Sequence, residues 1–159
     1  MKMKNQTNKL PFATIIAMAM TLLTALLVVA MTIFLPSILD FYLEYVSGGN
    51  ASYISTHKTP ILVLLYAALV PVYAAVAGLF MLLSNVHCGR VFTRSSVRLI
   101  GILSACVYAE SVICAVLSRY FILGAVLCFA ALLLGTLLLV VRSVIAQATE
   151  IKAENDFTV

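Results

Sequence analysis

Long runs of apolar residues, separated by short polar segments, divide the chain into four parts. The runs cover about residues 12–35, 61–83, 97–117 and 120–141. Each approaches the ~20 residues that an α-helix needs to cross a ~30 Å hydrocarbon core. One helix over the last two runs would be far longer than the bilayer is thick, and Ser118 and Arg119 form the only polar break between them. The pattern therefore predicts an all-α polytopic membrane protein, a bundle of four transmembrane helices with a tight turn between the last two.

The composition agrees with a membrane protein. Hydrophobic residues make up 64% of the chain and charged residues 10%, whereas about 25% of the residues in a soluble domain are charged. The four spans and their connections use nearly all of the 159 residues, so we expect one membrane domain and no separate catalytic or DNA-binding domain. The net charge of +4 is typical of membrane topology signals, and we expect no direct binding of nucleic acid.

Lysine and arginine residues are distributed unequally between the two sides of the predicted membrane. Of the ten such residues, only Lys58 and Arg119 fall on one side. Because cytoplasmic segments carry the excess of positive charge, both termini are predicted to be cytoplasmic. Residues 84–96 then form a cytoplasmic loop, residues 142–159 a cytoplasmic tail and residues 36–60 an external loop.

Aromatic and aliphatic residues recur at helical spacing in the external loop. They are Ile38, Phe41, Tyr42 and Tyr45. This spacing favours a short helix that lies in the interface with its rings at the depth of the lipid headgroups.

Small residues recur on one face of three predicted spans. They are Ala67, Pro71, Ala74 and Gly78 in the second span, Gly101, Ala105 and Ala109 in the third, and Gly124, Cys128, Ala131 and Gly135 in the last. Because small residues let helix backbones approach closely, we expect these faces to form the interior of the bundle. The alternative is that one of them joins two copies of the chain in a homo-oligomer.

Glu110 is the one acidic residue inside a predicted span. An ionised side chain there costs at least ~2.5 kcal/mol, so its presence needs an explanation. In one interpretation the carboxyl stays neutral and donates a hydrogen bond to a neighbouring helix. In the other, Glu110 couples a proton or a ligand to the function of the protein, as in a small oligomeric transporter or channel.

The cysteines near Glu110 raise the question of a metal. Cys106 and Cys114 flank Glu110 at a spacing of four residues, and Cys128 is expected at a similar depth. The spacing matches no established ligand motif and no predicted span contains histidine, so we expect neither a metal nor another cofactor. No catalytic triad, carboxylate pair or phosphate-binding loop is present, and we expect no enzymatic activity.

Two short motifs flank the last two spans on the predicted cytoplasmic side. The first is Val91-Phe92-Thr93 with Ser96-Val97, where Thr93 is predicted to cap the following helix. The second, Glu-Asn-Asp-Phe-Thr-Val, covers residues 154–159. With the topology, these motifs resemble a bacterial family of small four-helix membrane proteins that is catalogued as a domain of unknown function. The chain departs from the family at residues 94–96, where members often carry an acidic residue and an asparagine.

The resemblance implies a role in regulation. Genes of this family commonly lie beside a gene for a small Cro/CI-type helix-turn-helix regulator. The resemblance thus implies a non-enzymatic sensor or regulatory partner in the bacterial cytoplasmic membrane, acting through its cytoplasmic loop and tail. The candidate contact residues are Arg90, Phe92, Arg94 and Arg98 in the loop, and Glu154, Asn155, Asp156 and Phe157 in the tail. In the alternative interpretation, the arginines only anchor the chain at anionic headgroups.

Overall fold

The computed structural model describes residues 9–45, 51–89 and 92–156. Its helices are α1 (Lys9–Tyr45), α2 (Ala51–Thr56), α3 (Lys58–His87), α4 (Arg94–Leu117) and α5 (Ile122–Asp156). The helices α1, α3, α4 and α5 are each long and apolar enough to cross a membrane. The predicted fold class, an all-α membrane protein with four such helices, is confirmed.

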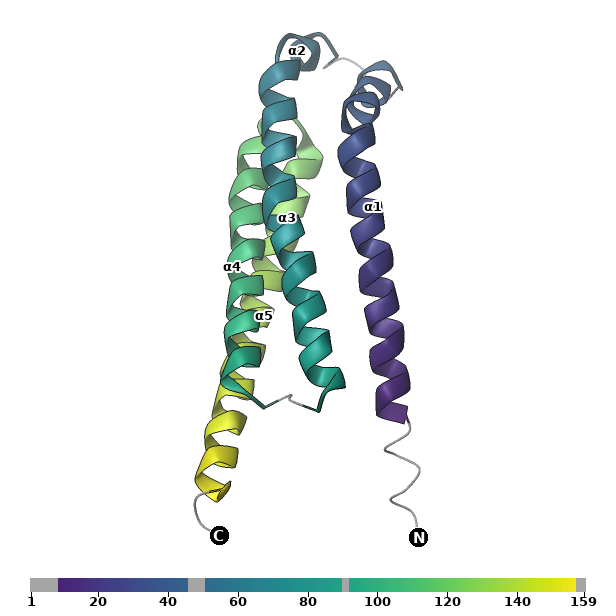
Figure 1. Ribbon diagram of the computed structural model, residues 1–159. Helices are drawn as coiled ribbons and strands as arrows, with labels where there is room; N and C mark the ends of the chain where they lie inside the picture. The colour runs from purple at the N-terminus through teal and green to yellow at the C-terminus, as the bar shows by residue number, and fades with distance from the viewer. Residues whose placement is uncertain (1–8, 46–50, 90–91, 157–159) are drawn as a thin grey trace.

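The long helices form an open series (Figure 1). Helix α1 packs against α3, α3 packs against α4, and α4 packs against α5. Among the described residues, no comparably extensive contact joins α1 to α5. The start of α1 and the end of α5 lie at the same end of the bundle (Figure 1). The bundle therefore has an open side between its first and last helices.

Helices α4 and α5 form the tight hairpin that the sequence predicts. The side chain of Thr93 accepts a hydrogen bond from the backbone N–H of Ser96 over 3.3 Å, which confirms the predicted N-cap of α4. Helix α4 ends at Leu117, and the backbone N–H of Tyr120 donates to the carbonyl of Leu117 over 2.9 Å. This short turn brings α5 back along α4.

Helix α1 runs past Pro36 to Tyr45. The segment predicted as a separate interfacial helix is helical, but it is the continuation of α1. Pro36 lacks the N–H that would donate to the carbonyl of Thr32, yet the helix continues past it. Tyr42 packs against the Phe121 ring edge to face, with 5.2 Å between centroids, so this aromatic residue stabilises the fold.

A small cluster of buried side chains closes this end of the bundle. We call Leu39, Ile54 and Ile61 the end cluster; they come from α1, α2 and α3. Ile54 is 1% exposed and Ile61 is fully buried. Partly buried residues pack around them: Tyr42, Leu43, Leu62, Leu65, Tyr120 and Phe121. The end cluster thus joins the first three helices to the turn between α4 and α5.

The predicted small-residue face of α5 is confirmed as an interior face. Gly124, Ala131 and Gly135 are buried, and Cys128 is half-buried. A Cβ atom on Gly124 would lie 2.7 Å from the backbone nitrogen of Ser118. Such close approach requires glycine, because no side-chain carbon fits in that space.

The predicted faces of the second and third spans are mostly wrong. In α3, Gly78 is buried but Ala67 and Ala74 are exposed, and in α4 both Ala105 and Ala109 are exposed. The interior of α4 instead holds buried serines: Ser96, Ser104 and Ser111. A serine is nearly as small as alanine, and its hydroxyl can bond to a helix carbonyl, which removes the cost of burying it.

Candidate functional site

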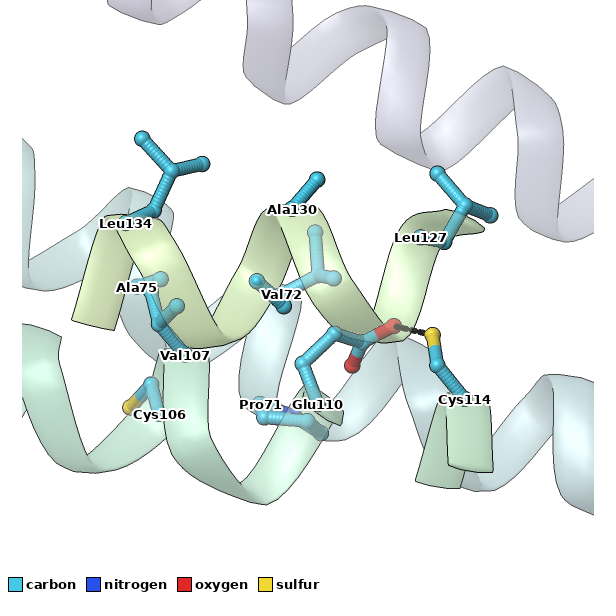
Figure 2. A pocket seen from close by; sticks show the side chains of 11 residues that line it. Pro71, Val72, Ala75, Cys106, Val107, Glu110, Cys114, Leu127, Ala130 and Leu134 are labelled. Atoms are coloured by element: carbon cyan, nitrogen blue, oxygen red, sulfur yellow. Dashed lines mark hydrogen bonds between the residues drawn. The ribbon is translucent and has the colours of Figure 1, made fainter. Parts of the chain in front are cut away.

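Glu110 lies in the second half of α4 beside a hollow of about 260 Å³. Figure 2 shows its carboxyl between residues of α3 and α5. The lining comes from three helices: Pro71, Val72 and Ala75 of α3, Cys106, Val107, Glu110 and Cys114 of α4, and Leu127, Ala130, Ala131 and Leu134 of α5. Apart from one carboxyl and two thiols, these side chains are apolar. The carboxyl therefore faces surroundings that offer it almost no polar contact.

The two oxygens of Glu110 differ in their contacts. The thiol of Cys114 donates to Oε1 over 3.9 Å, the contact drawn in Figure 2. Oε2 is buried and has no hydrogen-bond partner within the described part of the chain. The predicted hydrogen bond from Glu110 to a neighbouring helix is thus absent from the described residues. A buried polar atom without a partner costs about 1–3 kcal/mol, which marks Oε2 as a candidate binding atom.

A second hollow adjoins the first on the open side of the bundle. It measures about 320 Å³, and its lining includes Leu35 of α1 and Gly124 of α5. Cys114 and Leu127 border both hollows. The space beside Glu110 is therefore next to an apolar space that lies between α1 and α5.

The metal site considered from the cysteine spacing does not assemble. Cys106, Cys114 and Cys128 are all free thiols, and the first two line the Glu110 hollow. Within the ranges that the structure describes, no group of three or more His, Cys, Asp or Glu residues is placed to hold a metal ion.

A second candidate site lies where α5 continues past the start of α4 (Figure 1). Arg94 and Val97, in the first turn of α4, line one hollow with Ala146, Thr149 and Glu150 of α5. These residues are about fifty positions apart in sequence. The loop and the tail singled out in the sequence thus contact the same space.

Arginine residues from both helices border the neighbouring hollow. Arg94, Arg98 and Arg142 line it together with Gly101. A Cβ atom on Gly101 would lie 3.1 Å from Nε of Arg142, so the guanidinium group lies directly over the glycine. Among the residues described, none of these arginines forms a salt bridge. Three positive charges therefore line one hollow, and no described acidic group lies within salt-bridge distance of them.

The other predicted contact residues are only partly described. Phe92 is 46% exposed beside the start of α4, and Glu154 is exposed in the last turns of α5. Helix α5 includes Asn155 and Asp156, but their side chains lie outside the described residues, as do Arg90 and Phe157.

Comparison with known proteins identifies the family. Residues 48–159 match the family described as a protein of unknown function, DUF2975. The chain belongs to the DUF2975 family. The expected membership of an uncharacterised family is confirmed. No curated protein and no solved structure matches the chain.

Both candidate sites lie within the DUF2975 match. The matched region contains α2 to α5, and so includes Glu110 and both short motifs, whereas α1 precedes it. Arg142 and Glu150 also line this second site, but neither of the two sequence motifs contains them. The available signal was the helical pattern that continues past residue 141, because an antiparallel α5 must then lie beside the start of α4.

Proposed function

We propose that this DUF2975 protein is a non-enzymatic membrane protein that binds a cytoplasmic regulatory protein. Binding uses the α4–α5 end surface, which we define as Phe92, Arg94, Arg98, Arg142 and Glu150. The observation that carries the proposal is the hollow that Arg94 and Val97 share with the extension of α5. Two segments that are distant in sequence form one surface there, and this surface can bind a partner protein.

The chemistry of this surface supports a protein partner. Arginine and exposed aromatic residues are enriched at protein interfaces. Three arginines of this surface form no salt bridge with any described residue, and the exposed Phe92 precedes Arg94 by two residues. The fitting partner presents acidic groups around an apolar patch. A Cro/CI-type helix-turn-helix protein, which the family resemblance implies, is our specific proposal.

The protein also has a proposed location and a proposed orientation in the membrane. The protein lies in the bacterial cytoplasmic membrane with both termini inside. Two observations support this orientation: the two ends of the helical chain lie at one end of the bundle (Figure 1), and Arg94, Arg98, Arg142 and Lys152 lie at that end, against Lys58 and Arg119 at the other.

The test is co-purification of the full-length membrane protein with the helix-turn-helix protein encoded beside its gene. Reversing two charges, in the double variant Arg94→Glu with Arg98→Glu, should weaken capture at least about tenfold, because like charges would then face each other. Arg119→Glu is the matched control, since it reverses an exposed arginine at the opposite end. It should leave capture unchanged.

Two results would overturn the proposal. The first is no capture by the wild-type protein. The second is equal capture by wild type and double variant, which would mean that the arginines only contact anionic headgroups.

A small oligomeric transporter or channel is the second candidate. The buried, unpartnered Oε2 of Glu110 favours it, because carboxyl groups inside membranes commonly mark the paths of protons and ions. If the protein is a transporter or channel, it should not capture the regulator in the experiment above. Its transport rate should depend on Glu110.

A further inference from the structure

We infer that the hollow beside Glu110 is a binding site for a small lipophilic tertiary amine that enters from the bilayer between α1 and α5. The inference goes beyond the proposed function. If the protein is a regulator, this ligand is the signal that it senses.

The contacts of Glu110 determine the polar part of the ligand. Oε1 already accepts from the thiol of Cys114, and Oε2 alone is buried without a partner in the described chain. When the carboxyl is ionised, Oε2 can only accept, so a ligand that pairs with it brings one hydrogen-bond donor. A protonated tertiary amine has a single N–H, which matches the single free oxygen, whereas a guanidinium group would bury several donors that this lining cannot satisfy.

Charge also favours an amine over an alcohol. A carboxylate or an ammonium group alone is costly in apolar surroundings, but the two together form a charge-assisted hydrogen bond. Within the described lining, no lysine, arginine or histidine competes for the carboxyl. The ligand thus supplies the cation that the site lacks.

The walls of the hollow determine the rest of the ligand. Pro71, Val72, Ala75, Leu127 and Leu134 surround the carboxyl with apolar atoms. The volume of about 260 Å³ lies near the lower limit for small-molecule pockets, which start at about 300 Å³. The body of the ligand must therefore be apolar and small, and such a molecule concentrates in the bilayer.

A route from the bilayer follows from the open side of the bundle. The second hollow, bordered by α1 and α5, shares Cys114 and Leu127 with the Glu110 hollow. The two helices share no extensive contact among the described residues. A ligand dissolved in the hydrocarbon can thus reach Glu110 without passing through water.

The experiment uses the purified full-length protein in nanodiscs of zwitterionic lipid, with no regulator present. The probe is N,N-dimethyloctylamine, and the readout is the rate at which N-ethylmaleimide alkylates Cys114, followed by peptide mass spectrometry. The bound probe should protect Cys114, which lines the hollow, and leave the exposed Cys88 unprotected as an internal control. Because no partner protein takes part, a negative result for amine binding is distinct from a negative result in the co-purification of the regulator.

Two comparison compounds test the role of the N–H group. The hydrocarbon 2-methyldecane has nearly the same shape without nitrogen, and trimethyloctylammonium keeps the charge without an N–H donor. Neither should protect Cys114 as the tertiary amine does. Equal protection by either compound, or no protection by the amine, would overturn the inference.

Variants test separately the carboxyl of Glu110 and the volume of the hollow. In Glu110→Gln, the amine concentration for half-protection should rise on the order of tenfold, since the charge-assisted bond is lost. Ala130→Phe fills the hollow with Glu110 intact and should abolish protection, while Ala109→Phe, on the exposed face of α4, should preserve it. Circular dichroism checks the helix content of each variant. Unchanged protection in both Glu110→Gln and Ala130→Phe would place the amine elsewhere and overturn the assignment.

Discussion

The joint between α4 and α5 and the attachment of α1 are built in different ways. Along α5, small residues are buried against α4 over several turns, from Gly124 to Gly135. In the described part of α1, only Thr21, Leu35 and Leu39 are buried. The joint between α4 and α5 extends along both helices, whereas α1 is held chiefly near one end.

The difference has a physical origin. Lipid is as apolar as leucine, so a large apolar side chain that turns from lipid toward another helix gains only what close packing adds. Close backbone approach between small residues therefore stabilises α4 against α5. Helix α1 depends on the end cluster and on polar contacts such as the hydrogen bond between Thr32 and Tyr73, 2.7 Å between hydroxyl oxygens. Fewer contacts hold α1, which leaves a side of the bundle open.

The largest expected effect comes from the attachment of α1. Ile61→Ala removes a fully buried side chain from the end cluster and should lower the free energy of unfolding by roughly 2–5 kcal/mol, because the cavity cannot collapse completely. The measurement is unfolding in mixed detergent micelles followed by circular dichroism. Val63→Ala, at a position 63% exposed, is the control and should change stability by less than ~0.5 kcal/mol. Equal losses would show that the end cluster does not hold α1.

A somewhat smaller loss is expected at the joint between α4 and α5. In Gly124→Ala, the new Cβ would meet the backbone of Leu117 and Ser118 at 2.7 to 2.9 Å. Backbone atoms cannot move aside without reshaping the turn, so about 1–3 kcal/mol of stability should be lost in the same assay.

Gly101→Ala is the matched control for that substitution. Its Cβ meets only the flexible side chain of Arg142, at 3.1 Å or more, and alanine favours the helix. If both alanines were tolerated equally, close approach at Gly124 would not explain the stability of the joint.

Sequence patterns predicted the elements of the fold better than their packing. The four spans, the Thr93 cap and the small-residue face of α5 follow from local spacing, and the structure contains all of them. The interior faces of α3 and α4 could not be predicted from local spacing. Exposed alanines such as Ala74 and Ala105 have the same spacing as the buried small residues of α5. Which face turns inward depends on the neighbouring helices, and no local pattern encodes that.

For the two candidate sites, too, the sequence predicted the residues better than their contacts. The cost of an acidic residue in a membrane was enough to select Glu110 from the sequence. Its contacts were not predictable, because the free Oε2 depends on the rotation of three helices at once. Likewise, Arg94 and Arg98 were selected from the loop, but their proximity to Arg142 depends on how far α5 continues beside α4.

The smallest expected effect distinguishes packing from hydrogen bonding at the joint between α4 and α5. Ser104 donates from its hydroxyl to the carbonyl of Gly135 over 3.3 Å. Hydrogen bonds between membrane helices contribute about 0.6 kcal/mol on average, so Ser104→Ala should cost about that much in the unfolding assay. The control is Thr136→Ala, because the hydroxyl of the exposed Thr136 donates within its own helix, to the carbonyl of Leu133. A loss from Ser104→Ala as large as that from Gly124→Ala would mean that hydrogen bonds, and not close backbone approach, make this joint tighter than the attachment of α1.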